Sequence, residues 1–241
     1  MSSPKMVLVA ITKHGANQVA QLAAKLPEAD ILVAEKFQEL LAHNTAVQFY
    51  AGSFKAQIAD LFKKYDQIVF FVSLGAVVRL VAPFLKSKEE DPGIIVVDDA
   101  AQFVIPVLSG HVGGANACAE NLATLLGATP VLTTASDVSK TIPVDILGRE
   151  LGWQVEAPKI NITRVSAHVV NEEPIAFVQE AGSKNWWTRS TPLPKNIQLF
   201  DEFAAVDLSQ FKAVLWVTKQ AIPEALWQQL HESLVVYRVP E

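Results

Sequence analysis

The sequence predicts an α/β protein: an open, mostly parallel sheet with helices on both faces, followed by a second, smaller α/β domain. Three observations support this fold class. Short apolar runs alternate with segments whose apolar residues recur at helical spacing. Half of the 241 residues are apolar, which is enough for real cores. Small polar loops follow several apolar runs, as in sheets whose parallel strands are connected by helices.

The elements expected in the first domain follow this alternation. Its strands are predicted from the short apolar runs Met6–Ile11, Ile31–Ala34, Gln67–Ser73, Ile94–Val97, Phe103–Leu108 and Thr129–Thr133. Its helices are predicted from apolar residues at helical spacing in Ala16–Leu26, Phe54–Phe62, Val77–Leu85 and Asn116–Leu126. Two of the runs flank residues 98–102, a pattern that predicts either a hairpin or two separate sheet strands.

The pattern in the second domain is weaker. Apolar runs predict strands at Ile175–Gln179, Ala213–Val217 and Leu234–Val239, and helical spacing predicts helices at Pro143–Leu151 and Pro223–Leu230. A polar, proline-containing insert occupies Ala181–Asn196. We therefore expect domains at residues 1–142 and 143–241.

Composition excludes several classes of protein. The formal net charge of −5 argues against nucleic-acid binding through general electrostatics, so an anionic ligand needs a local basic patch. No apolar run approaches the length of a membrane span, and the run at Met6–Ile11 is too short for a signal peptide. The single cysteine, Cys118, excludes an internal disulfide and fits a reducing compartment. We expect a cytoplasmic protein without a membrane or nucleic-acid partner.

The most informative segment is the polar turn Ser109–Asn116, which follows an apolar run and opens a helical pattern. Such a turn leaves backbone N–H groups unpaired and points the positive end of the helix dipole at a ligand. His111 lies within it and is the best candidate for an acid or base, although loop histidines often only cap a helix or bond a backbone carbonyl.

Four small polar loops follow predicted strands, and ligands bind outside the carboxyl ends of strands in open parallel sheets. These loops are residues 12–15, 73–76, 109–116 and 134–137. We therefore expect the four loops to converge on one edge of the sheet and form a ligand site.

Other polar residues in or near these loops have two interpretations each. Ser109 is a nucleophile or a turn-stabilising hydroxyl, and the second is favoured because the G-x-S-x-G context is absent. Asp137 orients a histidine or water, or is an ordinary cap. Arg79 clamps a carboxylate or faces solvent. For Asp98 and Asp99 a solvated turn is slightly favoured.

Several other motifs carry no predicted chemistry. The spacing of Cys118 makes it a packing residue rather than a nucleophile. No metal site is expected, because the histidines are dispersed: His14, His43, His111, His168 and His231. The glycines at 110–114 lack the dinucleotide fingerprint. Trp186 and Trp187 form a lip for a flat ligand or, as we prefer, cover a junction between domains.

A set of motifs occurs together in one known family. In chain order they are Ala10-Ile11-Thr12 with Gly15, Gly75-Ala76-Val77-Val78-Arg79 with Ala82-Pro83, Asp91-Pro92, Val96-Val97-Asp98, Leu108 to Asn116, and Thr133 to Asp137. This order resembles the cobalamin biosynthesis protein G family, the cobalt-precorrin-5A hydrolases. The resemblance is strong over residues 6–150 and looser over the remainder.

The resemblance implies a function. Family members open the δ-lactone on ring A of cobalt-precorrin-5A and release acetaldehyde to give cobalt-precorrin-5B. The implied partner is a cobalt-corrinoid small molecule, and the cobalt belongs to that substrate, so the protein carries no cofactor of its own. Corrin-pathway methyltransferases and a second copy of the chain, forming a homodimer, stay open as further partners.

No residue role is carried over from the family, so the predicted site depends on the loops. We expect His111 to act as base or acid, with Ser109 and Asp137 supporting the histidine or a water. The residues expected to bind substrate lie in or next to the polar loops and offer backbone N–H groups, small polar side chains or a positive charge. They are Gly75, Arg79, Gly113, Gly114, Asn116, Thr134 and Ser136.

Family members commonly carry a further C-terminal domain, and this chain reaches only Glu241. Two alternatives to the hydrolase therefore stay open. The first is a non-catalytic corrinoid-binding module that needs a separate C-terminal domain. The second is an α/β domain that binds phosphate or a nucleotide at the Gly113-Gly114 helix terminus.

Overall fold

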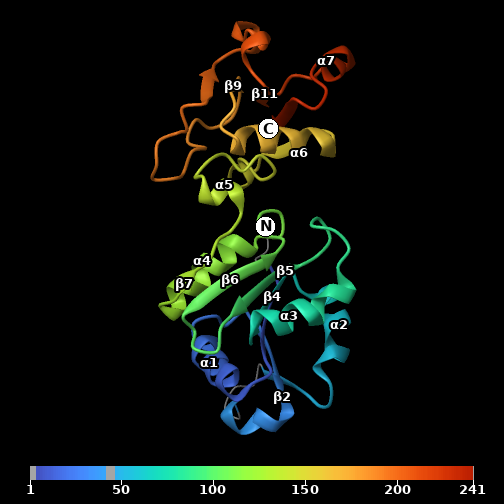
Figure 1. Ribbon diagram of the computed structural model, residues 1–241, viewed down its shortest axis with the longest axis vertical. Helices are drawn as coiled ribbons and strands as arrows, with labels where there is room; N and C mark the ends of the chain where they lie inside the picture. Colours follow the sequence, from blue (N-terminus) through green and yellow to red (C-terminus); the bar gives the residue numbers. More distant parts are fainter. Residues whose placement is uncertain (1–3, 42–46, 241) are drawn as a thin grey trace. The chain divides into compact units, whose positions relative to one another are not determined.

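The computed structural model describes residues 4–41 and 47–240, so His43 lies outside the described residues. The chain divides into two compact units, Met1–Leu132 and Thr133–Glu241. Each has its own sheet and its own cores (Figure 1). The expected fold class, mostly parallel sheets covered by helices, is confirmed.

The first unit is built on a seven-stranded sheet in the order β3-β2-β1-β4-β5-β6-β7. Its strands are β1 (Met6–Ala10), β2 (Asp30–Ala34), β3 (Val47–Tyr50), β4 (Gln67–Phe71), β5 (Gly93–Val97), β6 (Phe103–Leu108) and β7 (Thr129–Pro130). β1 to β5 are parallel to one another. β6 pairs antiparallel with β5, and β7 is parallel to β6, so the last two strands run in the opposite direction.

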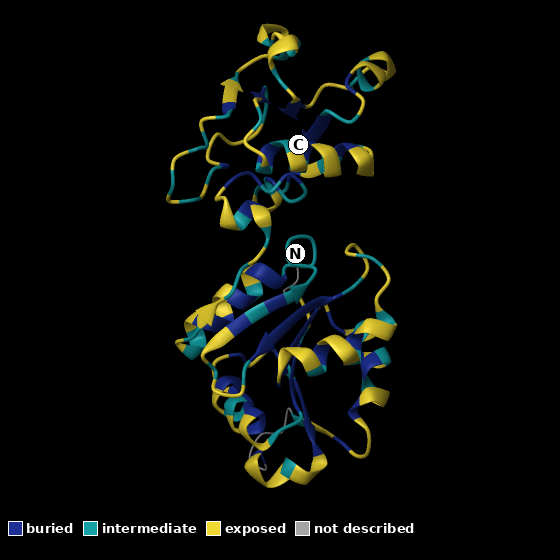
Figure 2. Cartoon of the chain, in the orientation of Figure 1, coloured by how far each residue is buried: buried dark blue, intermediate teal, exposed yellow. Residues whose placement is uncertain are grey.

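Helices cover both faces of this sheet because each strand of its centre is apolar on both sides. The helices and 3₁₀ segments are α1 (Lys13–Ala23), η1 (Glu35–Leu41), η2 (Phe54–Gln57), α2 (Ile58–Lys64), α3 (Leu74–Val81), η3 (Ala82–Phe84) and α4 (Ala115–Leu126). α1 and α4 pack in one core, and α2 and α3 pack in the core on the other face. β4 and β5 are buried at every position (Figure 2). This explains why these strands read as uninterrupted apolar runs.

A tight hairpin reverses the chain between β5 and β6. The Asp98 carboxylate accepts hydrogen bonds from the backbone N–H groups of Ala100, at 3.2 Å, and Phe103, at 2.6 Å. Ala101 adopts a left-handed conformation with φ of 52° and donates to the Asp98 carbonyl at 2.9 Å. Of the two expected arrangements of these runs, the hairpin is correct.

The second unit has a five-stranded sheet in the order β10-β9-β11-β12-β8. The strands are β8 (Gln154–Glu156), β9 (Ile175–Gln179), β10 (Ile197–Phe200), β11 (Ala213–Val217) and β12 (Leu234–Arg238). All are parallel except β8 at the edge. The helical segments are α5 (Ala135–Val138), η4 (Arg149–Leu151), α6 (Lys159–Val170), η5 (Phe203–Ala205), η6 (Leu208–Gln210) and α7 (Glu224–Gln229).

Segment 142–147 belongs to the core of the second unit. Ile142, Val144 and Leu147 are buried there, and the fully buried Tyr237 of β12 donates a hydrogen bond of 2.8 Å to the Val144 carbonyl. The units divide after Leu132, whereas the sequence analysis placed the boundary after residue 142. Ile142 packs in the core of the second unit, and residues 133–141, which precede it, belong to the same unit.

Some predicted elements of the second unit differ from the structure. Residues 143–151 were expected to be helical, but they form turns that end in the short η4. Gly148 has a left-handed φ of 70°, and a Cβ there would lie 2.2 Å from the Trp153 ring, so the chain turns tightly under that side chain. The apolar spacing reflects core packing, not a helix. α6, β3, β8 and β10 were not predicted.

We predict that Tyr237→Phe lowers the free energy of unfolding of the second unit by about 1–2 kcal/mol, because the buried Val144 carbonyl loses its donor. Unfolding can be followed by tryptophan fluorescence, since all five tryptophans lie in this unit: Trp153, Trp186, Trp187, Trp216 and Trp227. Tyr50→Phe, in the first unit, is the matched control and leaves this transition unchanged.

The same variant has a pH signature. Burial raises the pKa of Tyr237 well above its usual value of 10.0. Below pH 10 the phenol is neutral in both folded and unfolded chains; above it, only the unfolded chain ionises, so native stability is lost as pH rises. Above pH 10 the free energy of unfolding of the wild type therefore falls, whereas that of Tyr237→Phe has no such contribution. The difference in free energy of unfolding between the two proteins narrows as the pH rises. A gap that stays constant from pH 8 to 11 would contradict this account.

Candidate functional site

The carboxyl edge of the first unit has a topological switch point, because β2 lies on one side of β1 and β4 lies on the other. Thr12 follows β1 and caps α1: its Oγ1 accepts from the Gly15 N–H at 3.0 Å and donates to Asp99 Oδ1 at 3.3 Å. A Cβ on Gly15 would lie 2.7 Å from the Phe71 carbonyl oxygen. Glycine here lets the first turn of α1 approach the end of β4.

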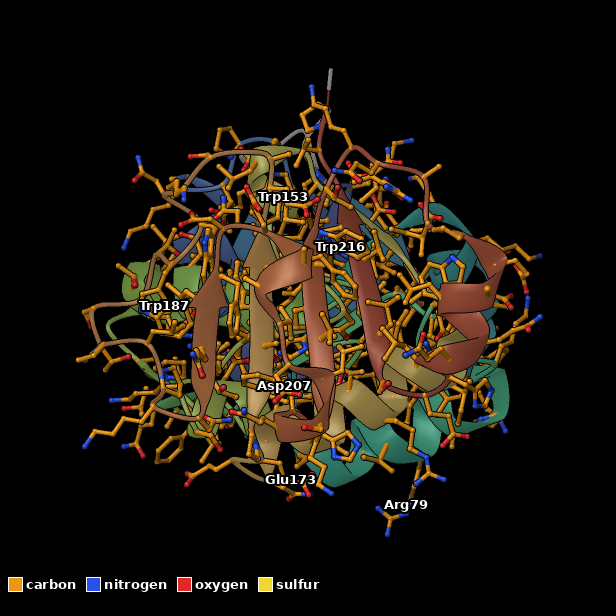
Figure 3. All side chains as sticks on the ribbon, turned by 90° about the horizontal axis from the view of Figure 1, so that it is seen from above. Arg79, Trp153, Glu173, Trp187, Asp207 and Trp216 are labelled. Atoms are coloured by element: carbon orange, nitrogen blue, oxygen red, sulfur yellow. The ribbon has the colours of Figure 1, made fainter. Side chains whose placement is uncertain are left out.

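Gly75 and Arg79 lie at this edge, in the first and second turns of α3. The Arg79 side chain is exposed (Figure 3). Its Nη1 donates to the Gly75 carbonyl at 2.8 Å. The guanidinium therefore rests on its own helix rather than in a pocket. Lys13 and His14, also exposed, begin α1, whose first turn contains no acidic residue. This edge thus offers basic side chains in the first turn of α1 and, through Arg79, from the last turn of α3, a composition that suits anionic groups.

The turn Ser109–Asn116 lies at the opposite edge. β6 is antiparallel to β5, with Leu108 paired to Ile94, so the end of β6 meets the start of β5. The Ser109 hydroxyl donates to the Asp91 carbonyl at 2.9 Å, and the Gln67 amide donates to the Gly113 carbonyl. The expectation that four loops meet at one edge is therefore wrong: it assumed parallel strands throughout.

This turn is held by its own backbone. The N–H groups of Gly114, Ala115 and Asn116 donate to the carbonyls of His111, Ser109 and Gly110 at 3.0, 3.2 and 3.0 Å. These donors are already engaged, which argues against the backbone of Gly114 and Asn116 as an oxyanion hole and against a phosphate cradle at this terminus.

Close contacts explain the glycines of the turn. A Cβ on Gly113 would lie 2.4 Å from Ser109 Cβ, and one on Gly110 would lie 2.6 Å from Asn116 Oδ1. Gly114 has a left-handed φ of 78°, and Ser109 shares that conformation at 54°. Asn116 is buried, and its side chain lies against Gly110. The turn is a rigid frame around the half-buried His111.

Thr134, Ser136 and Asp137 belong to the second unit: Thr134 is the N-cap of α5, and Ser136 and Asp137 lie within it. The Thr134 carbonyl accepts from Asp137 N–H at 3.0 Å, and the buried Ser136 has its carbonyl bonded to the Thr141 N–H at 2.9 Å. Asp137 forms an ion pair of 2.9 Å with Arg189 of the polar insert, and both side chains are largely buried. The structure thus gives Asp137 a fixed cationic partner.

Three residues with a clear role were not predicted. Gln67 is buried at the start of β4, and its Oε1 has no hydrogen-bond partner among the described residues. Its signal was a polar residue opening an apolar run. Asp91 supplies only a backbone carbonyl, and Arg189 stands in an irregular insert, so neither had a periodic signal.

Other motifs are structural. Trp186 is buried in the core of the second unit, stacked on Phe177 with ring centroids 4.2 Å apart, so it does not form a lip. Burial raises the pKa of the Cys118 thiol to about 12, which keeps it protonated near neutral pH. Among residues 4–41 and 47–240, no group of three or more potential metal ligands occurs, and no helix is long and apolar enough to cross a membrane.

Two family models match the chain in succession. The model described as cobalamin synthesis G N-terminal matches residues 56–137, and that described as cobalamin biosynthesis central region matches residues 142–238. The chain belongs to the cobalamin synthesis protein G family. The boundary between the matched regions lies close to the division between the two units.

Curated relatives carry one description. A cobalt-precorrin-5A hydrolase of Priestia megaterium is 42% identical over 96% of this chain and 61% of its own length, and one of Salmonella typhimurium is 30% identical over 86% and 52%. The chain thus spans between half and two thirds of these relatives. A solved structure described as a cobalamin biosynthesis protein G homologue from Sulfolobus solfataricus is 22% identical, with a TM-score of 0.49, covering 97% of this chain and 60% of that one.

The packing of the turn yields a prediction on stability. Gly113→Ala forces a Cβ into Ser109 and destabilises the first unit by more than about 2 kcal/mol. Gly75→Ala, whose Cβ meets only the end of the Arg79 side chain at 3.3 Å, is the control and stabilises α3 by up to about 1 kcal/mol. Circular dichroism measures both, and an unchanged melting temperature for Gly113→Ala would disprove the tight packing.

The raised pKa of Cys118 makes its reactivity predictable. In the folded chain at pH 8 the thiol reacts with a disulfide reagent far more slowly than in urea, because the thiolate is the nucleophile and is scarce below pH 12. Rapid stoichiometric labelling of the folded chain would show that the thiol is accessible and ionised.

Proposed function

We propose that this chain supplies the N-terminal and central parts of a cobalt-precorrin-5A hydrolase, which opens the ring-A δ-lactone and releases acetaldehyde to give cobalt-precorrin-5B. The observation that carries the proposal is the 42% identity to a cobalt-precorrin-5A hydrolase over 96% of this chain. The cobalt is part of the substrate, so the residues of the chain need supply only binding, orientation and proton transfer.

The proposed chemistry needs one acid–base group. Water attacks the lactone carbonyl, and the loss of the two-carbon fragment then requires a proton to leave a hydroxyl. A histidine near neutral pH serves both steps. We assign this role to His111, because it is the titratable side chain inside the rigid turn Ser109–Asn116. Ser109, bonded to the Asp91 carbonyl, supports the frame of the turn.

The remaining predicted residues take narrower roles in this proposal. β4 and β5 have five residues each and separate the two edges by about 17 Å, so a group at Arg79 and one at His111 do not share a single small pocket. We therefore assign the reaction centre to the His111 turn, with Gly113, Gly114 and Asn116 shaping it. Gly75 and Arg79 become part of a separate basic edge for substrate carboxylates.

In the second unit, we assign Thr134, Ser136 and Asp137 to the support of substrate or water through α5. The ion pair with Arg189 fixes the Asp137 carboxylate. If Asp137 acts only through this ion pair, substitution of Arg189 lowers turnover as much as substitution of Asp137. Loss of activity in Asp137→Asn together with wild-type activity in Arg189→Gln would assign Asp137 to the substrate rather than to the frame.

The first experiment is anaerobic incubation of the purified chain with cobalt-precorrin-5A, with trapping of acetaldehyde and measurement of the corrinoid mass. Acetaldehyde with the matching mass loss supports the hydrolase. A bound, spectrally shifted corrinoid without release overturns the assignment of activity to this chain alone and favours a binding module. The absence of both overturns the proposal.

We predict that His111→Ala lowers turnover by at least about 100-fold, the usual contribution of a general acid or base. His231→Ala, an exposed histidine of the second unit, is the control and retains turnover. Corrinoid binding by spectral titration separates a chemical from a binding defect. Near-normal turnover in His111→Ala would remove this residue from the mechanism.

A further inference from the structure

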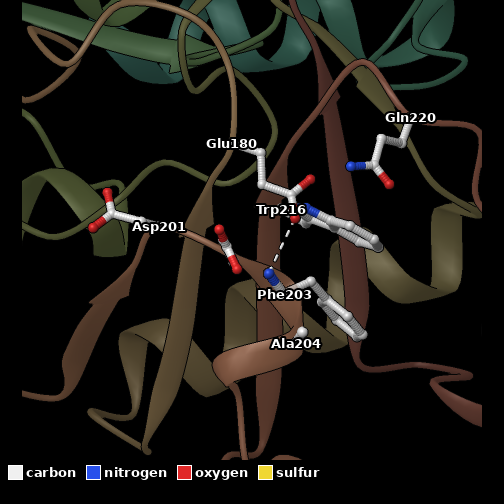
Figure 4. Close-up of a pocket in the computed structure, with 7 residues that line it drawn as sticks. Glu180, Asp201, Phe203, Ala204, Trp216 and Gln220 are labelled. Carbon is white, nitrogen blue, oxygen red and sulfur yellow. Dashed lines mark hydrogen bonds between the residues drawn. The ribbon is translucent and has the colours of Figure 1, made fainter.

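The second unit has a switch point of its own. In the sheet order β10-β9-β11, the chain goes from β9 to one neighbour and then to the other, and the three strands are parallel. Their carboxyl ends therefore open a crevice of the kind in which α/β sheets bind ligands. A pocket of about 530 Å³ lies there, lined by residues that end or follow these strands: Glu180, Asp201, Glu202, Phe203, Trp216 and Gln220 (Figure 4).

The charge of this pocket is negative. Three of its lining residues are carboxylates and none is basic. Lys184 pairs with Asp201 at 2.6 Å and lowers the pKa of that carboxyl. The Arg238 guanidinium donates to the carbonyl of the lining residue Gln220, and it is paired with Glu156, which does not line the pocket. Because Glu156 balances Arg238, Lys184 is left against three lining carboxylates, which is an excess of negative charge, and the walls of a crevice focus the potential inside it. A carboxylate-rich corrinoid is repelled here, so the pocket is not explained by the proposed function.

One of the carboxylates is fixed in place. Glu180 follows β9 directly; its Oε1 accepts from the Phe203 N–H at 3.0 Å, and its Oε2 accepts from the Thr218 hydroxyl at 2.8 Å (Figure 4). Thr218 is fully buried and also accepts from the Gln220 N–H at 3.1 Å. Each carboxylate oxygen keeps a further lone pair for a ligand donor. The acceptor is thus oriented before a ligand arrives, which reduces the entropic cost of binding.

The pocket wall is aromatic. Phe203 stacks on Trp216 with centroids 4.2 Å apart and ring planes 16° apart. Trp216 is only 5% exposed, and its indole N–H has no hydrogen-bond partner among the described residues. A buried donor without an acceptor is unfavourable, and an acceptor atom on a ligand removes that cost. Aromatic faces next to carboxylates suit an organic cation.

We propose that this pocket binds a ligand with a protonated amine or guanidinium group next to a hydrogen-bond acceptor. The cation meets the carboxylates of Glu180, Asp201 and Glu202, and the acceptor faces Trp216. The same chemistry is offered by a small free amine and by a lysine or arginine side chain of a polypeptide. The inference is independent of corrinoid hydrolysis.

The test uses the whole chain labelled with ¹⁵N and follows the indole N–H resonance of Trp216, assigned from its loss in Trp216→Phe. N-acetyl-L-argininamide stands for a peptide side chain, and 2-aminoethanol stands for a free amine. N-acetyl-L-citrullinamide, which has the same shape without the charge, is the matched neutral probe. We expect a saturable shift with at least one cationic probe, weakened by salt, and none with the neutral one.

Variants show whether the pocket causes the shift. Asp201→Asn and Glu202→Gln each weaken binding about tenfold, as expected for the loss of one ionic contact. Glu224→Gln on α7, an exposed carboxylate outside the pocket, leaves affinity unchanged and controls for net charge. Tryptophan fluorescence on melting checks that every variant is folded.

Three outcomes overturn the proposal. The first is the absence of a shift with both cationic probes, and the second is an equal shift with charged and neutral probes. The third is an equal loss of affinity in Glu224→Gln. A shift with argininamide alone assigns the site to a basic polypeptide side chain, and a shift with aminoethanol alone assigns it to a free amine; each supports the proposal.

Discussion

The hairpin at Asp98 is the constraint on which the rest of the first unit depends. Its carboxylate binds two backbone N–H groups of the turn, which reverses the chain within five residues and pairs β6 antiparallel to β5. A helical crossover at this point would have kept β6 parallel. Because the hairpin replaces it, the end of β6, and with it the turn Ser109–Asn116, meets the starts of β4 and β5. The chemistry of the first unit is therefore divided between two edges.

The positions of the strands could be predicted from the sequence better than their directions. β9 and β11 match their predicted bounds, and β4 and β5 were found from uninterrupted apolar runs, because burial on both faces leaves a strong signal. The direction of β6 left no such signal in the sequence. Residues 98–102, between β5 and β6, are compatible with a hairpin or with a crossover connection. Residues 143–151 show the opposite failure, since Val144, Leu147 and Leu151 have helical spacing although turns, not a helix, direct them into one core.

The candidate site was predicted where it depends on local backbone and missed where it depends on tertiary contacts. Gly113 and Gly114 indicated a tight turn, and the structure has a tight turn there. That its N–H groups bind the carbonyls of the same turn follows from the path of the chain, which no spacing reveals. The contacts of Gln67 and Arg189 were even less predictable, because they join residues far apart in the sequence. Each is a single polar residue whose partner, Gly113 or Asp137, lies about fifty positions away.

Side chains of opposite charge stand at the two switch points of the chain, and our proposals of different ligands for them depend on this difference. In the first unit, Lys13 and His14 stand in the first turn of α1, where the helix dipole disfavours positive charge. Arg79 lies in the last turn of α3, and its guanidinium reaches back to the Gly75 carbonyl. An anion bound at that edge relieves the repulsion. In the second unit, Glu180, Asp201 and Glu202 create the reverse field, which Lys184 offsets only in part through its ion pair with Asp201. The formal net charge of −5 does not reveal this difference, because basic and acidic side chains are placed at separate sheet edges. The two ligand proposals, for corrinoid carboxylates and for an organic cation, depend on that placement.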